Sequence, residues 1–253
     1  MITSPSNPAI RALAALRNRT SREETGTFLI EGRREIERAH AAGIDLLRVI
    51  RREGVDPPSV DAPETQVGPA AFEKIAYGRD GLIAVARTPD FALGAFPAPD
   101  LLLVAVAIEK PGNLGALLRT CDAVGAGMLV VDPVTDLVNP NIVRASTGAL
   151  FTVPIALAQS PEAVAWLGQE GFRLLATIVG EGTPPWELDL RGRCAIAIGN
   201  EDFGLPRTWI ELAGEHITLP QAGCVDSLNV AVTAGAVLFE AVRQRVSGKL
   251  GER

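Results

Sequence analysis

The sequence has few of the residues that build disulfide frameworks, zinc sites or histidine-dependent catalysts. It contains three cysteines and two histidines among 253 residues. The cysteines are far apart and form no CxxC pair, so the sequence predicts neither disulfides nor a metal site. Because His216 falls at the edge of an expected strand and only one other histidine is present, a histidine-centred triad is also disfavoured.

Long apolar runs and the common cofactor loops are absent as well. The longest apolar stretches, such as residues 101–108, are much shorter than the roughly 20 residues that a membrane helix needs. Residues 1–20 contain no long apolar stretch that ends at a small-residue cleavage site. No GxGxxG, GxxxxGKS/T or HExxH motif occurs, which removes the usual phosphate loops and zinc-protease ligands. We expect a globular protein of the cytoplasm without a membrane partner.

Positive charge gathers at the start of the chain, although the whole sequence has a net charge of -6 at pH 7. Residues 1–55 contain ten arginines and seven acidic residues, and the first four arginines precede every acid. Guanidinium groups match phosphate oxygens, so this arm suits contacts with phosphates. A solvated basic helix end explains the composition equally well. The four arginines are Arg11, Arg17, Arg19 and Arg22.

Alternating strand and helix patterns predict two α/β parts. Short apolar strands and helical patterns that end at glycine indicate a small α/β domain over residues 1–88. Residues 89–99 contain prolines and show little periodicity, as a linker does. Residues 100–253 contain unbroken apolar runs, the pattern of strands buried on both faces of a parallel sheet. We therefore expect an α/β fold with a mainly parallel sheet in the second domain. The apolar runs are residues 101–108, 128–131, 173–178, 194–198 and 216–219.

Three segments carry polar residues directly after expected strands, where open α/β sheets place their ligands. The segments are residues 109–126, 195–206 and 217–242. In the first, Asn113 follows a glycine at the start of an expected helix and can cap it, whereas Arg119 lies away from the apolar face. A helix cap and a surface arginine are the plain structural alternatives.

The second and third segments show the same combination of apolar structure and polar residues. In the second, a buried strand ends at Gly199, which allows a sharp turn or a close approach to a ligand, and delivers Asn200 and Glu201 to the sheet edge. In the third, Ser227 and Asn229 open a long, nearly apolar helix whose N-terminal amides favour an anionic or polar group. A tight turn with a solvated glutamate, and Ser227 as a simple N-cap, are the structural alternatives.

Taken in order, these segments closely resemble the successive motifs of the SpoU, or TrmH-like, ribose methyltransferases of the SPOUT superfamily. The resemblance is carried by NLGALLRTCDAVGA, NIVRASTGALFTVPI at 141–155, IAIGNEDFGLP and LPQAGCVDSLNVAV, and it extends over residues 100–246. The N-terminal stretches SNPAIRALAALRNRT and GTFLIEG resemble the family's substrate-binding domain. Gln221 stands where a methionine is common and Cys121 where alanine often occurs, and neither departure changes a polar residue expected to act.

The resemblance implies both a function and an architecture. Members of this family transfer a methyl group from S-adenosylmethionine to a ribose 2′-hydroxyl of RNA, either ribosomal RNA or transfer RNA. The C-terminal part of their sheet is threaded through a deep trefoil knot, a rare exception among protein folds. They usually form homodimers through helices that include the C-terminal one, which agrees with the apolar breadth of residues 228–246. By motif match, the residues expected at the cofactor are Thr177, Gly199, Asn200, Leu219, Pro220, Ser227 and Leu228.

The resemblance also implies roles for the polar residues. Placing the ribose oxygen in line with the methyl group supplies much of the catalysis in such a transfer. Arg119 is the candidate base, although a guanidinium ordinarily stays protonated in proteins. The alternative is that Arg119 binds the adjacent phosphate or stabilises the developing alkoxide. Arg144 would contact RNA or shape the site. The residues that would orient Arg119, the ribose and the cofactor are Asn113, Glu201, Ser227 and Asn229.

Two rival functions compete with this interpretation. A protein that keeps the fold, but only binds RNA or senses the cofactor, has no physical need for all five polar residues together. A small-molecule methyltransferase fits poorly with an added N-terminal domain that is rich in arginine. The target nucleotide, and the choice between a housekeeping and an antibiotic-resistance role, stay open.

Overall fold

The computed structural model describes residues 1–97 and 99–250, which gather into two compact units. Unit 1 comprises residues 1–90 and 136–152. Unit 2 comprises residues 91–135 together with the chain from residue 153 onward. The sequence pattern did not indicate that residues 136–152 return to unit 1. The predicted domain boundaries stay a prediction.

Unit 1 is built around a four-stranded sheet in the order β1-β4-β2-β3. β4 pairs antiparallel with β1 and β2, whereas β2 and β3 are parallel. The strands are β1 (Thr27–Glu31), β2 (Leu46–Arg52), β3 (Glu64–Val67) and β4 (Leu82–Arg87). The helices of this unit are α1 (Pro8–Ala15), α2 (Arg19–Thr25), α3 (Arg33–Ala41), α4 (Pro69–Glu73), α6 (Pro140–Ser146) and α7 (Ala149–Thr152).

The N-terminal arm of unit 1 is ordered by a helix cap and by burial of one apolar face. Asn7 caps α1 by accepting a hydrogen bond from the backbone N–H of Ala9 at 2.9 Å, and a proline at the first helical position suits that start. The helix then buries Ile10, which packs in one cluster with Phe72 and Ile83. The basic arm is therefore a folded part of unit 1.

Unit 2 contains a six-stranded sheet in the order β10-β8-β9-β5-β6-β7, and every neighbouring pair is parallel. This confirms the predicted α/β fold with a mainly parallel sheet. Each apolar run of the sequence overlaps one strand of this sheet, and only β7 falls outside those runs. The strands are β5 (Leu101–Val106), β6 (Gly127–Val131), β7 (Ile155–Ala158), β8 (Arg173–Thr177), β9 (Cys194–Ile198) and β10 (Glu215–Ile217).

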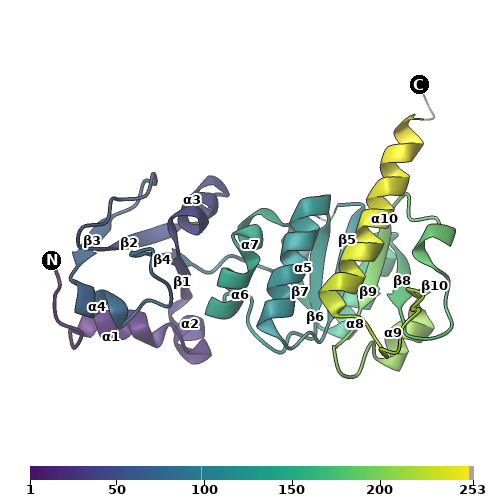
Figure 1. Cartoon of the computed structure of the whole chain (residues 1–253), viewed down its shortest axis with the longest axis horizontal. Coiled ribbons are helices and arrows are strands. Elements are labelled where there is room, and N and C mark those ends of the chain that lie inside the picture. The colour runs from purple at the N-terminus through teal and green to yellow at the C-terminus, as the bar shows by residue number, and fades with distance from the viewer. Residues whose placement is uncertain (98, 251–253) are drawn as a thin grey trace. The chain divides into compact units, whose positions relative to one another are not determined.

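Helices cover the parallel sheet, and two of them lie side by side. α5 (Pro111–Val124) packs along α10 (Val230–Leu250), as Figure 1 shows in teal and yellow. The other helical segments of unit 2 are η1 (Leu93–Ala95), α8 (Ser160–Gln169), η2 (Pro185–Glu187) and α9 (Arg207–Leu212). Within the described residues, none of the helices is sufficiently long and apolar for a membrane span.

The order of the strands brings distant parts of the chain to one edge. After β7, the chain crosses to β8 on the far side of β5, and β9 then lies between β8 and β5. Since all six strands are parallel, their carboxyl ends share an edge, and the loops after β5, β8, β9 and β10 meet there. The trefoil knot implied by the family resemblance stays a prediction.

Candidate active site

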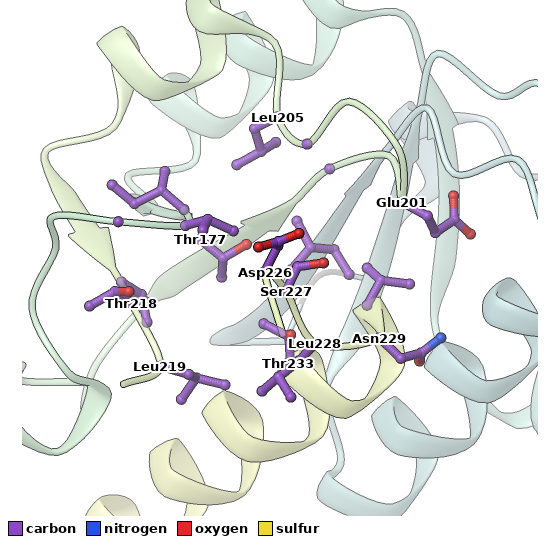
Figure 2. A pocket seen from close by; sticks show the side chains of 18 of the residues that line it. Thr177, Glu201, Leu205, Thr218, Leu219, Asp226, Ser227, Leu228, Asn229 and Thr233 are labelled. Carbon is purple, nitrogen blue, oxygen red and sulfur yellow. The ribbon is translucent and has the colours of Figure 1, made fainter. Parts of the chain in front are cut away.

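A cavity of about 1140 Å³ lies at the carboxyl ends of β8, β9 and β10 (Figure 2). Its walls are formed by residues that follow these strands, by the start of α10 and by the first turn of α5. Crevices at such strand ends bind ligands because backbone groups and loop side chains face one space. The volume is sufficient for a nucleoside-sized ligand.

The strand β9 ends in a turn that brings two backbone segments into close contact. A Cβ added at Gly199 would lie 2.1 Å from the carbonyl carbon of Gly204 and 2.2 Å from the backbone nitrogen of Leu205. The Gly204 N–H also donates to the carbonyl of Asn200 at 2.9 Å, which closes the loop on itself. This contact within the protein accounts for glycine at position 199.

Asn200 holds this turn in place through both ends of its amide. The side chain is only 8% exposed, and its Nδ2 donates to the carbonyl of Ala107 at 3.0 Å and to Oε1 of Glu109 at 3.1 Å. Its Oδ1 accepts hydrogen bonds from the backbone N–H groups of Asp202 at 2.8 Å and Phe203 at 3.2 Å. A buried amide with both ends engaged positions its surroundings. Asn200 therefore fixes the loop that carries the next residue, the catalytic candidate Glu201.

Three of the predicted polar residues form one hydrogen-bonded chain at the cavity wall. Asn113 donates through Nδ2 to Oε1 of Glu201, and its Oδ1 accepts a hydrogen bond from Nδ2 of Asn229 at 3.2 Å. The three residues come from α5, from the loop after β9 and from the start of α10. Figure 2 shows Glu201 and Asn229 on the side of the cavity where α5 lies. Polar residues that lie far apart in the sequence are thus in contact in the structure.

The helix starts differ from two of the alternatives considered from the sequence. α5 begins at Pro111 with Lys110 as its cap, so Asn113 lies inside the first turn and its side chain is used for Glu201 rather than for capping. α10 begins at Val230, and Asn229 caps it by accepting the Ala231 N–H at 2.9 Å. The interpretation of Asn113 and Ser227 as simple N-caps is therefore wrong, and Asn229 is the capping residue of α10.

Residues predicted at the cofactor all line this cavity, while their contact with the cofactor stays a prediction. The Thr177 hydroxyl donates to the carbonyl of Ala197 at 3.0 Å, which ties the end of β8 to β9. Apolar side chains around the cavity are unusually exposed, with Val179 at 71%, Val225 at 63% and Leu228 at 40%. Exposed apolar groups around a hollow are typical of a ligand site. The lining residues in question are Thr177, Gly199, Asn200, Leu219, Pro220, Ser227 and Leu228.

The structure adds an acidic residue that the sequence analysis missed. Asp226 lines the cavity, and Figure 2 shows it beside Ser227 with its carboxylate in the hollow. Thr218 and Thr233 contribute two further hydroxyl groups to the lining. An acid next to Ser227 was a visible signal in the sequence, because a carboxylate suits the ammonium end of an amino-acid-like ligand. Across the described residues, no group of three or more His, Cys, Asp and Glu side chains could hold a metal ion.

Arg119 lies on the same helix as Asn113 but outside the residues that line the cavity. The two residues are six positions apart, which corresponds to about 9 Å along the helix axis. The side chain of Arg119 is exposed, and it has no ion-pair partner within the described part of the chain. Its predicted catalytic role therefore concerns a substrate that approaches from outside the cavity.

Arg22, one of the predicted RNA-binding arginines, is occupied inside unit 1. The side chain is 3% exposed, and its Nη2 and Nε pair with the carboxylate of Asp136 at 2.6 and 3.0 Å. Its Nη1 donates to the carbonyls of Leu16 and Arg17, both at 2.8 Å. A buried guanidinium that donates four hydrogen bonds favours a structural role, in which Arg22 connects residue 136 to the N-terminal arm.

The other arginines predicted to bind RNA have exposed side chains. Arg19 forms an exposed pair with Glu23 at 2.6 Å, an i,i+4 arrangement within α2. The hydrogen bond to Glu23 is also the main cause that raises the pKa of Arg19. The set with exposed side chains is Arg11, Arg17, Arg19 and Arg144.

Two family models match the chain, one in each part of the sequence. The SpoU rRNA Methylase family matches residues 100–239, which is more than half of the chain. The MRM3-like substrate binding domain matches residues 7–81. The first match contains all of the catalytic and cofactor candidates described above.

Relatives with known names match nearly the full length. The 23S rRNA (uridine(2479)-2′-O)-methyltransferase of Streptomyces viridochromogenes is 34% identical over 260 residues, covering 93% of this chain and 89% of the relative. A solved RNA 2′-O ribose methyltransferase is 42% identical, with a TM-score of 0.85 and coverage of 97% of this chain and 99% of that chain. The SpoU methyltransferase AviRb from Streptomyces viridochromogenes, solved in complex with the cofactor AdoMet, is 29% identical with a TM-score of 0.88, covering 95% and 99%.

Proposed function

The chain belongs to the SpoU rRNA methylase family, and from this premise we propose that its natural substrate is 23S ribosomal RNA. The protein is an S-adenosylmethionine-dependent RNA 2′-O-methyltransferase, because its relatives are named for this reaction and similar structures hold AdoMet. The proposal of 23S rRNA is supported by a relative that matches 93% of this chain and is named for that RNA. The structural observation that best supports catalysis is the Asn113–Glu201–Asn229 chain of hydrogen bonds at the cavity wall.

The cavity has the chemical groups that S-adenosylmethionine needs. Leu219 and Leu228 supply apolar surface for the adenine and the thioether region, and the carboxylate of Asp226 can pair with the ammonium group of the methionine part. Ser227 adds a hydroxyl that can donate to a carboxylate. When bound, S-adenosylmethionine supplies the electrophilic methyl group of a sulfonium.

The polar chain at the cavity wall would orient the reacting ribose. Asn113 fixes both Glu201 and Asn229 through its two amide atoms, so neither side chain needs to search for its position when substrate arrives. Preorganised polar groups of this kind lower the barrier because they are already aimed when charge develops. We assign Glu201 and Asn229 to positioning of the ribose beside the methyl donor.

Arg119 would act as an electrostatic group rather than as a base. A guanidinium stays protonated in proteins, and the exposed Arg119 has no acidic partner among the described residues. Its charge is therefore available to bind the phosphate next to the reacting ribose or to stabilise the alkoxide that forms at the 2′ oxygen. The proton of the hydroxyl would leave by another route, such as water.

A homodimer through α10 is the second part of the proposal. Val232, Phe239 and Val246 are between 54% and 56% exposed, and they follow one another at intervals of seven residues on this helix. A seven-residue spacing keeps the three side chains on one side of the helix, as at helix-to-helix contacts. A second copy of the chain would cover this stripe by symmetric contact.

Ribosomal RNA as the substrate also implies that the enzyme acts in the cytoplasm.

A methylation assay tests the proposed reaction and its substrate together. The purified protein is incubated with radiolabelled S-adenosylmethionine and, separately, with 23S rRNA and transfer RNA from cells that lack the gene. We expect label in 23S rRNA, and a single new ribose that resists alkaline cleavage, since a 2′-O-methyl group blocks attack on the neighbouring phosphate. Label in transfer RNA alone would overturn the choice of RNA. Cofactor binding without transfer to any RNA would favour the non-catalytic rival.

A further inference from the structure

Two arginine side chains converge on the ring of the only tyrosine in the sequence. The guanidinium carbon of Arg17 lies 4.4 Å from the centroid of the Tyr77 ring, and that of Arg144 lies 5.6 Å from it. All three residues belong to unit 1 and have exposed side chains, with Tyr77 at 42%. We call this trio the arginine clamp.

Hydrogen bonds fix the clamp at its base. Arg17 donates through Nη2 to the carbonyl of Ala76 at 2.8 Å, directly before the tyrosine. The backbone N–H of Tyr77 donates to the Glu31 carboxylate at 3.0 Å, which anchors the loop to the end of β1. The ring then attracts both guanidinium groups through its negative face. Three segments that are distant in the sequence, α1 with its following turn, the loop after α4, and α6, therefore meet at one exposed point.

The charge of the clamp is not neutralised within the described part of the chain. Neither of its arginines has a carboxylate within ion-pair distance there, whereas Arg19 and Arg22 in the same arm pair with Glu23 and Asp136. The Glu31 carboxylate accepts hydrogen bonds from the backbone N–H groups of Tyr77 and Gly78, and it forms no ion pair with either arginine within the described residues. The two guanidinium carbons lie at most about 10 Å apart, the sum of their distances from the ring centroid, so one anion that contacts both would be attracted by two positive charges.

We propose that the arginine clamp binds a backbone phosphate of the RNA substrate, and that Tyr77 is the positioning residue that holds the two guanidinium groups together. The proposal rests on the proposed function, because the RNA supplies the phosphate. Guanidinium forks match phosphate oxygens in geometry, and Arg17 spends only one N–H on Ala76. The clamp would thereby set the register of the RNA on unit 1 without reading its sequence.

The test measures RNA affinity over a series of salt concentrations, using a fluorescein-labelled oligoribonucleotide of mixed sequence. The double variant Arg17→Gln/Arg144→Gln should bind about tenfold more weakly, and the slope of log affinity against log salt should fall by about 0.7 to 0.9, the value of one lost phosphate contact. The matched control is Arg48→Gln, which removes one exposed charge from the same unit and should change affinity less than about twofold.

Substitutions of Tyr77 separate the contribution of its ring to RNA binding from the contribution of the two arginine charges. Tyr77→Phe keeps the ring and should bind RNA as the wild type does, whereas Tyr77→Leu should weaken binding about fivefold although no charge is lost. Melting temperature and S-adenosylmethionine affinity show that each variant is folded. If the double variant behaves as the Arg48→Gln control does, or if Tyr77→Leu binds as the wild type does, the clamp is overturned. Failure of the proposed function is distinguishable, because the wild type would then label transfer RNA rather than 23S rRNA in the methylation assay, whereas failure of the clamp is measured by RNA affinity alone.

Discussion

Replacing Gly199 with alanine should disable the site through a backbone collision. Gly199 does not adopt a positive φ, so its lack of a side chain, rather than its conformational freedom, is what the turn requires. The added Cβ would lie 2.1 to 2.2 Å from backbone atoms of Gly204 and Leu205. Backbone atoms cannot rotate away as the end of a flexible side chain can, so the loop from 200 to 204 must move as a whole.

The size of that movement determines the expected loss. Non-bonded carbon atoms pack at about 3.5 Å, so the two segments must separate by about 1 Å or more. Such a shift would break the 2.9 Å hydrogen bond between Gly204 and Asn200 and displace Glu201 from Asn113. Misplacement of a reacting group by about 1 Å can lower a rate about 100-fold. Overpacking of this kind also costs about 1–3 kcal/mol of folding free energy.

Gly223→Ala provides a matched control, because this glycine also lines the cavity and an added Cβ would meet no described atom within 4 Å. The assays are methyl transfer to 23S rRNA and thermal unfolding without cofactor. We expect Gly199→Ala to lose about 100-fold in turnover and to melt several degrees lower, at about 2–4 °C for each kcal/mol. If Gly199→Ala loses activity yet melts as the control does, the glycine serves the cofactor rather than the turn. If both variants are active, the account of the turn is wrong.

Three further changes probe charge, burial and assembly. Arg119→Ala should abolish transfer while S-adenosylmethionine affinity by calorimetry stays within about twofold, and wild-type turnover in this variant would remove Arg119 from the mechanism. Burial raises the pKa of Cys121 to about 12 and also raises that of Cys194, so only the exposed Cys224 should react with a thiol reagent at neutral pH. Three thiols should react after denaturation, and rapid modification of either buried thiol in the native protein would contradict this burial. Phe239→Glu should shift the light-scattering mass from dimer to monomer while Phe239→Leu stays dimeric, and a monomeric wild type would refute the interface.

The sheet of unit 2 could be predicted from the sequence because its strands are buried on both faces. β5, β6 and β9 contain no exposed residue, and an unbroken apolar run is the direct sequence mark of such strands. β7 (Ile155–Ala158) is four residues long and was missed by the sequence analysis, although all four of its residues are apolar. The return of residues 136–152 to unit 1 depends on contacts such as Arg22 with Asp136, 114 residues apart, which no local pattern can indicate.

The residues of the site were predictable, whereas their contacts were not. Glu201 and Asn229 were predicted as site residues because they follow expected strands, and the carboxyl ends of parallel strands lie at one edge of the sheet. The hydrogen bond between Asn113 and Glu201 joins residues 88 positions apart, and the segments that carry them come together because β9 lies beside β5 in the sheet. One local error was avoidable, because Pro111 favours the first position of a helix and so excludes Asn113 as its cap.

Asn229 performs two tasks that substitution can separate. Its Oδ1 caps α10 through the Ala231 N–H, while its Nδ2 donates to Asn113. Aspartate caps a helix as well as asparagine does, but it has no side-chain donor when ionised. In Asn229→Asp the cap would remain, and two oxygens would face each other where Nδ2 had donated to Oδ1 of Asn113. A flip of the Asn113 amide would restore that contact only by turning its oxygen toward the Glu201 carboxylate.

Asn229→Asp should therefore keep the melting temperature of the wild type but lose most of its methyl transfer. Asn229→Ala removes both the cap and the donor, so it should lose transfer and also about 1 kcal/mol of stability. Thermal unfolding and the rate of transfer at saturating S-adenosylmethionine measure the two effects. An active Asn229→Asp enzyme would show that the helix cap is the only contribution of this residue. A stable and inactive one would mean that the hydrogen bond from α10 to α5 is required to aim Glu201 at the ribose.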